Sequence, residues 1–423
     1  MRKIKYLIIG AGISGLSVAM QLKEDYLIIE KENRVGGLCK TFYQDGFVWD
    51  YAGHFFHFAT PEIKSFFEQR IPACEMVKCI KKTTINYNGI RVDYPFQMNI
   101  HQLPKDEFID CLYDLFHREE KKEYNGFEEM LYGKFGKSIT EKFLKPYNEK
   151  LYACDLNYLD TDAMGRFFPY ADPKQIIDNM KKGDVQTYNS MFDYPKLGAQ
   201  LFIDTIMKEI DCTGVMLNAK VDRIDTGRKV AYVSGTEIQY DYLINTTPLN
   251  RFTKIVSEYN NRGVSNKLSC NKVLVFNLGF DRQANNTDVH WTYVPSKKIC
   301  FYRMGFYSNI LGTDKLSMYI EIGFSENEII DVERQLQKTI IGLKELKVIE
   351  DHNLVAFNHL IIDPGYVHIT QESIETVAAL REELKEKKIY TIGRYGGWTY
   401  CSIEDCIVEA INLANVLKKE NNK

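Results

Sequence analysis

The sequence predicts an α/β protein with a Rossmann-type dinucleotide-binding domain, a helical insertion and an antiparallel-sheet substrate domain. Three observations support this prediction. A short apolar strand, a glycine-rich turn and a helix open the chain within residues 4–23. From Pro104 to about residue 189 the pattern changes to helices with tyrosine-rich connections. Strand-like stretches separated by turns then fill most of residues 214–323.

The N-terminal unit has the order strand, helix, strand. Residues 4–9 form an apolar run typical of a buried strand, residues 13–23 suit a helix, and residues 26–30 form a second apolar run. Consecutive strands joined through a crossover helix lie parallel in one sheet. The start of the chain therefore predicts a parallel sheet.

The remaining elements alternate in a way that makes the first domain discontinuous. We expect further helices over 61–70, 196–210, 326–343 and 403–418, and strands over 83–92, 214–225, 229–233, 238–246 and 388–393. The predicted division is a dinucleotide-binding domain of 1–60, 190–250 and 385–423, a helical domain of 104–189, and a sheet-rich substrate domain of 61–103 and 251–384.

Composition excludes several classes of partner. The chain is 45% hydrophobic and 26% charged with a net charge of −3, which lacks the basic excess of a nucleic-acid surface. Its ten cysteines contain no Cys-x-x-Cys pair, so we expect no metal, and free thiols are typical of a reducing cytoplasm. Glycines interrupt the apolar run of residues 6–20, which is too short to span a membrane.

Gly10, Gly12 and Gly15 stand between the first strand and the first helix in the spacing Gly-x-Gly-x-x-Gly. Glycines here permit a tight turn and close approach of the backbone to a pyrophosphate. The helix N-terminus then offers free N–H groups and a positive dipole end. Glu30 ends the second strand, where a carboxylate would accept hydrogen bonds from ribose hydroxyls. The sequence therefore predicts a dinucleotide site.

The segment after this acidic residue separates FAD from NAD. Arg34-Val-Gly36-Gly37 resembles an element of the glutathione-reductase-like FAD oxidoreductases, especially the amine-oxidase branch, and 242–248 and 391–394 resemble later FAD motifs. The helix from Ile403 would direct its N-terminus at the N1/O2 edge of the flavin. The residues expected to contact FAD are Gly10, Gly12, Ser14, Gly15, Glu30, Lys31, Gly36, Gly37, Leu38, Gly53, His54, Val221, Gly393, Arg394 and Ile403.

Five further segments resemble one family, the UDP-galactopyranose mutases, and more closely the eukaryotic type. They are 53–57, 94–97 with 103–105, 146–148 with 151–153, 301–304 with 307–309, and 393–400. The resemblance implies that N5 of the reduced flavin attacks the anomeric carbon of a nucleotide sugar, expels the nucleoside diphosphate and forms a flavin–sugar adduct. The sugar ring then opens and recloses through another hydroxyl, without net oxidation.

The same resemblance implies roles for individual residues. Arginine suits a departing and returning diphosphate, because its planar fork holds phosphate oxygens bidentately. The catalytic set implied is Arg166, Arg303, Tyr366 and Tyr400 at the diphosphate and His54 beside the flavin ring. The nucleoside end, where an aromatic ring would stack on the base and amides would read its edge, is implied to be Tyr94, Gln97, Phe143, Tyr147 and Asn148.

The chain departs from the mutases at two places. Residues 194–200 carry fewer glycines than the eukaryotic-type members, and Tyr400 is followed by Cys401-Ser-Ile instead of a longer polar loop. These changes leave open which sugar nucleotide is the substrate. The alternative is an FAD-dependent oxidase or dehydrogenase of the amine-oxidase or protoporphyrinogen-oxidase type, which would need an apolar pocket. NAD(P)H is a candidate reductant for the mutase; the sequence leaves the oligomeric state open.

Overall fold

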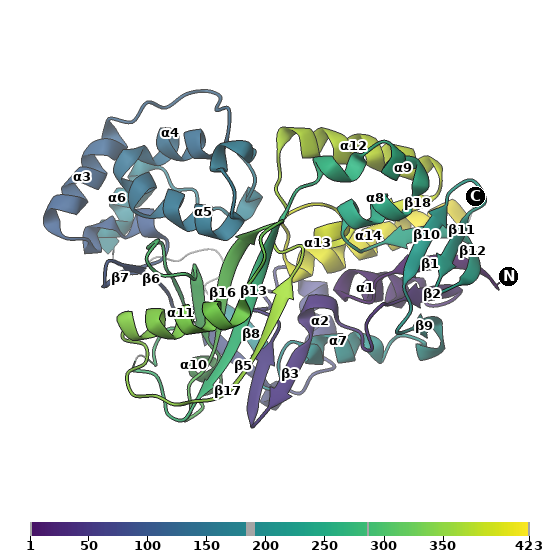
Figure 1. The fold of residues 1–423 in the computed structure, drawn as a ribbon, viewed down its shortest axis with the longest axis horizontal. Helices are drawn as coiled ribbons and strands as arrows, with labels where there is room; N and C mark the ends of the chain where they lie inside the picture. Colours follow the sequence, from purple (N-terminus) through teal and green to yellow (C-terminus); the bar gives the residue numbers. More distant parts are fainter. Residues whose placement is uncertain (1, 183–190, 286, 422–423) are drawn as a thin grey trace.

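A computed structural model describes residues 2–182, 191–285 and 287–421. These residues form two seven-stranded sheets, two small two-stranded sheets and a helical unit at one end of the molecule (Figure 1). The predicted mixed α/β architecture is confirmed. The predicted helical domain and the segment after it meet at residues 183–190, which lie outside the described residues.

The first sheet is the Rossmann-type layer. β1 runs parallel to β2 and β12, and Ile9 at its end lies opposite Ile29 and Asn245. The predicted strand–helix–strand unit is therefore confirmed. Its strands are β1 (Arg2–Ile9), β2 (Tyr26–Ile29), β9 (Val215–Met216), β10 (Val221–Asp225), β11 (Val230–Val233), β12 (Thr236–Asn245) and β18 (Ile389–Thr391).

Helices cover both faces of this sheet, which is why its strands are continuous apolar runs. Ile8 and Leu7 belong to the cores on opposite faces. One face packs against α1 (Ile13–Leu22), α2 (Pro61–Glu68), α7 (Gln200–Met207) and α14 (Ile403–Asn421); the other packs against α8 (Leu249–Ile255), α9 (Ser257–Asn261) and α12 (Gln371–Glu386).

Three helices from the range predicted for the sheet-rich domain, apart from the last two residues of α12, pack on the first sheet; the domain boundaries themselves stay a prediction. These helices are α2, α9 and α12. Phe67 of α2 and Leu380 of α12 are buried there at 3% and 4% exposure. Their apolar faces complete the two cores of the Rossmann-type layer, a long-range contact that chain position does not reveal.

The second sheet has the strand order β17-β13-β16-β15-β14-β6-β7 and is antiparallel except where β14 meets β6. The predicted single strand over 83–92 is wrong. Asn88 and Gly89 have φ of 51° and 83° and turn the chain back as a hairpin. The strands are β6 (Thr83–Tyr87), β7 (Ile90–Asp93), β13 (Asn271–Phe280), β14 (Trp291–Tyr293), β15 (Arg303–Phe306), β16 (Ser317–Ser325) and β17 (Leu354–Ile362).

The helical unit packs around a separate apolar core that Tyr302, beside the second sheet, also enters. Its helices are α3 (Lys105–Phe116), α4 (Phe127–Ile139), α5 (Lys145–Tyr152) and α6 (Pro173–Lys182). The remaining elements are α10 (Tyr307–Leu311), α11 (Val332–Glu345), α13 (Gly393–Gly396), β3 (Thr41–Gln44), β4 (Phe47–Asp50), β5 (Met76–Ile80) and β8 (Met191–Pro195).

Three predicted elements are shorter than expected, and each has a local cause. α11 begins at 332 and not at 326, because the Asp331 side chain caps it by accepting the Arg334 N–H. Gly198, with φ of 82°, delays α7 to residue 200. Asn218, with φ of 51°, separates β9 from β10 within the predicted strand of 214–225.

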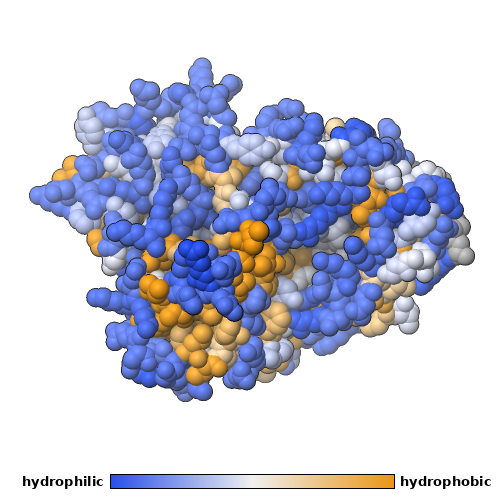
Figure 2. Space-filling view, viewed as in Figure 1, coloured by the Kyte–Doolittle hydropathy of each residue, from blue (hydrophilic) through white to orange (hydrophobic). Residues whose placement is uncertain are grey.

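The visible surface is mainly polar, with apolar residues gathered over the sheet-rich part (Figure 2). Ile329, Ile341, Val355, Phe357 and Ile361 are exposed large apolar side chains. Within the described ranges, every helix is too short or too polar to cross a bilayer.

Candidate functional site

A cavity of about 1000 Å³ lies against the carboxyl ends of the central strands of the first sheet and reaches the second sheet. Ile9, Ile29 and Thr246 line it from the first sheet, and Arg303 and Glu321 line it from the second. In open α/β sheets, ligands bind outside the carboxyl ends of the strands. The cavity therefore joins the predicted dinucleotide site to the substrate domain.

The glycine-rich turn is required by packing. Gly10 has φ of 101°, and a Cβ there would lie 2.5 Å from Oγ1 of Thr246. A Cβ on Gly15 would lie 2.0 Å from the carbonyl oxygen of Gly10. Glu30 stabilises the conformation of the turn, because its Oε2 accepts a hydrogen bond from the Ala11 N–H at 2.8 Å. Helix α1 starts here without a side-chain cap, so its first N–H groups are available to a ligand.

The predicted glycine pair after the second strand contacts the glycine-rich turn that follows the first strand. Gly36 and Gly37 have φ of 125° and 58°, and the Gly36 N–H donates to the Ala11 carbonyl at 2.8 Å. A Cβ on Gly37 would lie 3.0 Å from the Cα of Gly12. Bare backbone thus lines this end of the cavity. A helix N-terminus together with such a cradle fits the pyrophosphate of a dinucleotide.

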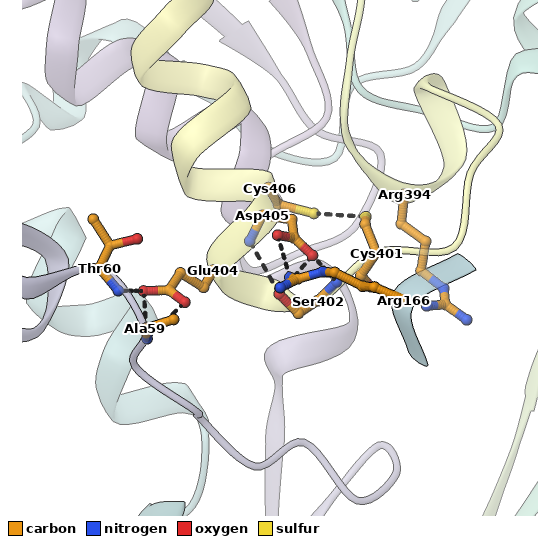
Figure 3. A network of polar contacts seen from close by, with 9 residues as sticks. All are labelled: Ala59, Thr60, Arg166, Arg394, Cys401, Ser402, Glu404, Asp405 and Cys406. Carbon is orange, nitrogen blue, oxygen red and sulfur yellow. Dashed lines mark hydrogen bonds and ion pairs between the residues drawn. The ribbon is translucent and has the colours of Figure 1, made fainter. Parts of the chain in front are cut away.

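Ser402 and Ile403, at the N-terminus of α14, line the cavity. Figure 3 shows the polar contacts that hold this end of the helix. Ser402 Oγ accepts the Asp405 N–H at 3.1 Å, and Asp405 Oδ2 accepts the Ser402 N–H at 2.8 Å. Glu404 accepts the Ala59 and Thr60 N–H groups at 2.9 and 2.7 Å. These contacts fix where the helix begins and place its positive dipole end at the cavity.

The remaining predicted cofactor residues mostly share this wall. Glycine at position 393 lets Ser14 approach, since a Cβ there would lie 2.3 Å from the Ser14 Oγ. The predicted cofactor residues that line the cavity are Gly10, Gly12, Ser14, Glu30, Lys31, Gly36, Gly37, Leu38, Gly53, His54, Val221, Arg394 and Ile403.

Arg303 is the buried cation of the second sheet. Its side chain is 16% exposed, and its Nη1 lies 3.4 Å from Oε1 of Glu321, which is 4% exposed. The guanidinium also lies over the rings of Trp291 and Tyr319, 5.4 and 5.3 Å from their centroids. These contacts hold the guanidinium at the wall of the cavity, which Arg303 lines.

A second arginine, Arg394, lies at the two predicted phosphate tyrosines. Its guanidinium is 5.3 Å from the ring centroid of Tyr366 and 4.6 Å from that of Tyr400. The two rings stack with centroids 5.8 Å apart. Burial raises the pKa of Tyr366 well above its ordinary value, so its hydroxyl stays protonated and can donate. Arg394, predicted only as a flavin contact, therefore also lies among the tyrosines.

His54 is neutral at physiological pH. Burial, together with the positive charge of Arg394 and Arg303, lowers its pKa to about 4. Its Nδ1 lies 3.1 Å from the carbonyl oxygen of Ala52. Donation of the Nδ1 proton to that carbonyl leaves Nε2 as an acceptor.

The residues predicted for the nucleoside end form a cluster of their own. Tyr94 and Tyr147 lie on either side of Tyr293, with ring centroids 5.1 and 5.0 Å from it. Phe143 stacks on Tyr147 at 5.2 Å. Burial is the main cause that raises the pKa of Tyr94 and of Tyr147 well above the ordinary value, and the charge of Arg303 opposes it in both. The cluster therefore lies beside Arg303.

Two buried amides accompany this aromatic cluster. Gln97 Nε2 donates to the Pro169 carbonyl, and Asn148 Nδ2 donates to the Leu144 carbonyl at 2.7 Å. The oxygen of each amide is buried without a hydrogen-bond partner among the residues that the structure describes. An unsatisfied buried acceptor is costly, and a donor supplied by a ligand would remove that cost.

Arg166 is the most exposed of the residues predicted for the substrate. Its side chain is 49% exposed and pairs with Asp405, at 2.5 Å between Nη2 and Oδ1 (Figure 3). Its neighbour Phe167 contacts Tyr400, with ring centroids 5.1 Å apart. The structure thus brings Arg303, Tyr366 and Tyr400 to the cavity wall. Among the described residues, that wall includes neither Arg166 nor the five residues predicted for the nucleoside end.

A family model of the flavin-containing amine oxidoreductases matches residues 13–417, nearly the whole chain. The chain belongs to this family. The predicted flavin cofactor is thereby confirmed at the level of the family. A curated relative, protoporphyrinogen oxidase 2 of Arabidopsis thaliana, is 33% identical over 98 residues, which cover 21% of this chain and 18% of the relative. The matched segment is thus less than a fifth of that protein.

Solved structures share the fold of this amine oxidoreductase family member. A crystal structure of reduced UDP-galactopyranose mutase superposes with a TM-score of 0.93 at 23% identity, covering 100% of this chain and 95% of that one. A putative protoporphyrinogen oxidase from Exiguobacterium sp. 255-15 has a TM-score of 0.72 at 16% identity, covering 99% of both. A fatty acid isomerase from P. acnes has a TM-score of 0.67 at 13% identity, covering 97% of this chain and 98% of that one. The predicted likeness to the mutase fold is confirmed.

Sequence reasoning missed several residues of the site in this flavin-containing amine oxidoreductase. Tyr293 joins Tyr94 to Tyr147, and Glu321 opposes Arg303 across adjacent strands. One signal was present for Glu321, which is the single charged residue in the apolar strand 317–325 before Ser325. A charge in such a strand is buried at a cost unless it has a partner. No comparable signal marked Tyr293 among 27 tyrosines.

Proposed function

We propose that this protein is a flavin-dependent mutase that interconverts the pyranose and furanose forms of a nucleotide sugar, UDP-galactopyranose and UDP-galactofuranose or a close relative. FAD, in its reduced form, would supply the nucleophile at N5 for the anomeric carbon. One observation carries the proposal. Two partly buried arginines, Arg303 and Arg394, line the cavity together with Tyr366 and Tyr400, an arrangement that suits an anion beside a flavin.

The charge balance favours a diphosphate. Two guanidinium groups line this part of the cavity, and Glu321 compensates one of them. A buried charge without a partner is unfavourable, so the site is completed by an anionic ligand. A substrate oxidised by hydride transfer in an apolar pocket would leave Arg394 and the tyrosines without a comparable role.

The tyrosines would hold the leaving group as neutral donors. Burial keeps the pKa of Tyr366 well above its ordinary value, so its O–H persists through physiological pH. Tyr400 stacks on Tyr366 and would offer the second hydroxyl. Hydroxyl and guanidinium donors aimed at phosphate oxygens stabilise charge that develops as the sugar–phosphate bond breaks.

The nucleoside would bind against the aromatic cluster. Tyr94 and Tyr147 would offer faces for stacking, with Phe143 packed between Tyr147 and Phe96 as their support. The amides of Gln97 and Asn148 each have a carbonyl oxygen without a partner among the described residues, which would accept an N–H of the base. Pyrimidine N–H groups suit such acceptors. Arg166 at the rim would add charge when the diphosphate is bound, and neutral His54 would accept a hydrogen bond at the flavin.

A flavin oxidase is the second candidate, and one observation favours it: the 33% identity to a protoporphyrinogen oxidase over 98 residues. The fold likeness ranks the mutase higher, with a TM-score of 0.93 against 0.72 for the oxidase structure. The deciding experiment incubates the reduced holoprotein with UDP-galactofuranose and separates the products by chromatography. UDP-galactopyranose without net redox change supports the mutase, whereas oxygen-dependent substrate oxidation supports the oxidase.

A further inference from the structure

Two cysteines lie next to each other in the wall of the flavin cavity. Cys401 precedes α14 and Cys406 lies in its first turns, with their sulfur atoms 3.5 Å apart (Figure 3). Both line the cavity. Cys406 is buried at 5% exposure and Cys401 is half-buried, and each is a free thiol. Neither has a part in the proposed sugar chemistry.

The surroundings make one of the two sulfurs the nucleophile. A hydrogen bond from the Cys401 thiol, with further ones from Ser14 and the Arg394 backbone, lowers the pKa of Cys406. The same contact with Cys406, reinforced by burial, raises the pKa of Cys401. Cys406 is therefore the more acidic of the two thiols, and a thiolate formed there would accept a hydrogen bond from the Cys401 thiol. The N-terminus of α14 adds a favourable dipole for that charge.

The geometry also allows the two sulfurs to bond. A disulfide has an S–S length of about 2.05 Å, so the sulfurs have to approach by about 1.5 Å. The segment between them is held in place by the reciprocal hydrogen bonds of Ser402 and Asp405. Rotation of the two side chains can supply the approach, because both lie at one end of one helix.

We propose that Cys401 and Cys406 are a peroxide-reactive dithiol that closes to a disulfide in the wall of the flavin cavity. Hydrogen peroxide is small enough to reach a buried thiol, and it forms when a reduced flavin meets dioxygen. The inference rests on the flavin site of the family and not on the identity of the sugar, so it can fail or hold independently of the mutase proposal.

The reaction has two balanced steps. The Cys406 thiolate attacks one peroxide oxygen; the O–O bond breaks, an S–O bond forms, and the products are a sulfenic acid and hydroxide. The Cys401 sulfur then attacks the sulfenic sulfur, forming the S–S bond and breaking the S–O bond. The two cysteines lose two electrons and the peroxide gains them. Its two oxygens leave as a water, formed with the proton of the Cys401 thiol, and as the hydroxide of the first step, which takes up a proton from solvent.

Other cysteines serve as internal controls. Cys39 also lines the cavity, but burial raises its pKa far above the ordinary range, which keeps it a protonated and slow thiol. Cys74 and Cys212 are exposed to solvent. If exposure alone governed oxidation, these two would react before Cys406.

The experiment starts from holoprotein whose cysteines are reduced and from which the added thiol reductant has been removed. It is treated with equimolar hydrogen peroxide in the absence of a sugar nucleotide. Free thiols are then alkylated, and peptides are mapped by mass spectrometry. We expect a Cys401–Cys406 link to form at least about tenfold faster than oxidation of Cys74 or Cys212, and dithiothreitol to reverse it. Free Cys401 and Cys406 alongside oxidised Cys74 or Cys212 would overturn the proposal, as would a Cys39–Cys406 link.

Two variants identify the order of the steps. Cys401→Ser should stop at a sulfenic acid on Cys406, which dimedone traps, whereas Cys406→Ser should give no trapped adduct on Cys401. Cys212→Ser is the matched control and should form the disulfide like the parent protein. Mapping the unsubstituted protein decides the main claim even when a variant fails to fold.

Discussion

Arg303 and Glu321 face each other across the adjacent antiparallel strands β15 and β16, with Nη1 of the arginine 3.4 Å from Oε1 of the glutamate. The register of the two strands places these residues directly opposite each other. The long contact and the single carboxylate leave the remaining guanidinium donors for a ligand in the cavity. This pair places a guanidinium of the second sheet at the cavity wall, and the first prediction follows from it.

Arg303→Ala should weaken UDP binding at least about tenfold, because a charge-assisted hydrogen bond of roughly 1.5–3 kcal/mol is lost. Flavin content should not change, since the glycine cradle around Gly10 lies at another part of the cavity wall. Titration with UDP and the flavin-to-protein ratio measure the two effects. Arg303→Lys should recover only part of the affinity, because an ammonium lacks the planar fork.

Arg223→Ala is the matched control, since that guanidinium also lies over an aromatic ring, 4.0 Å from the centroid of Tyr232, but on an exposed strand residue. It should bind UDP like the parent. Unchanged UDP affinity in Arg303→Ala with flavin intact would remove the diphosphate role and favour the oxidase.

Arg166→Ala should weaken UDP binding less than Arg303→Ala does. The Arg166 side chain is 49% exposed and already pairs with Asp405, and an exposed ion pair is screened by water and salt. Raising the ionic strength should reduce the effect of Arg166→Ala more than that of Arg303→Ala. A larger loss in Arg166→Ala at every salt concentration would show that Arg166 and not Arg303 is the main phosphate contact.

Gly15→Ala should lose most of the bound flavin, because the added Cβ would lie 2.0 Å from the Gly10 carbonyl oxygen and displace the turn. Gly227→Ala is the control: its nearest atom would lie at 3.6 Å. Absorbance of the purified proteins gives the flavin-to-protein ratio. Full flavin occupancy in Gly15→Ala would contradict the role assigned to this turn.

Asp50 should make stability depend on pH. Burial raises its pKa from 3.8 to about 6, although Thr41, Ala199 and Tyr194 donate hydrogen bonds to it. Between the two pKa values the folded state binds more protons at Asp50 than the unfolded state does. The contribution of Asp50 to the free energy of unfolding therefore falls as pH rises from about 4 to about 6. The loss amounts to about 3 kcal/mol.

Urea unfolding at pH 4 and pH 7 gives the change in the free energy of unfolding between the two pH values. Comparing this change in the parent protein and in Asp50→Asn isolates the contribution of Asp50. The variant should differ in absolute stability, because an amide has one acceptor oxygen where the carboxylate has two, but it should lack this part of the pH dependence. Equal differences between the two pH values in both proteins would contradict the assignment.

The sequence was most informative where a residue type has one physical reason to be present. The glycines at 10, 15 and 36 are required by close approach or by a positive φ, so the dinucleotide turn could be located before the fold was known. Arg303 was implied by the resemblance to the mutases, and its place in an apolar strand, paired with Glu321, agrees with a functional reason for the charge. Arg394 was recognised as part of a flavin motif, yet its position over Tyr366 and Tyr400 depends on tertiary packing.

Other features depend on contacts between distant parts of the chain. The pairing of Arg166 with Asp405 joins residues 239 positions apart, and no local pattern indicates it. The packing of α2 and α12 on the first sheet likewise follows from where their apolar faces find a core. The hairpin at Asn88–Gly89 is the exception, since that dipeptide is a turn signal that sequence reasoning could have used.

The measurement that tests the central claim most directly compares reduced and oxidised holoprotein with UDP-galactofuranose in the absence of oxygen. The account predicts conversion to UDP-galactopyranose by the reduced protein, negligible conversion by the oxidised protein, and a flavin absorbance spectrum that returns to its starting form after turnover. Conversion by oxidised protein at the same rate, or stoichiometric flavin reduction by the sugar nucleotide without isomerisation, would contradict it.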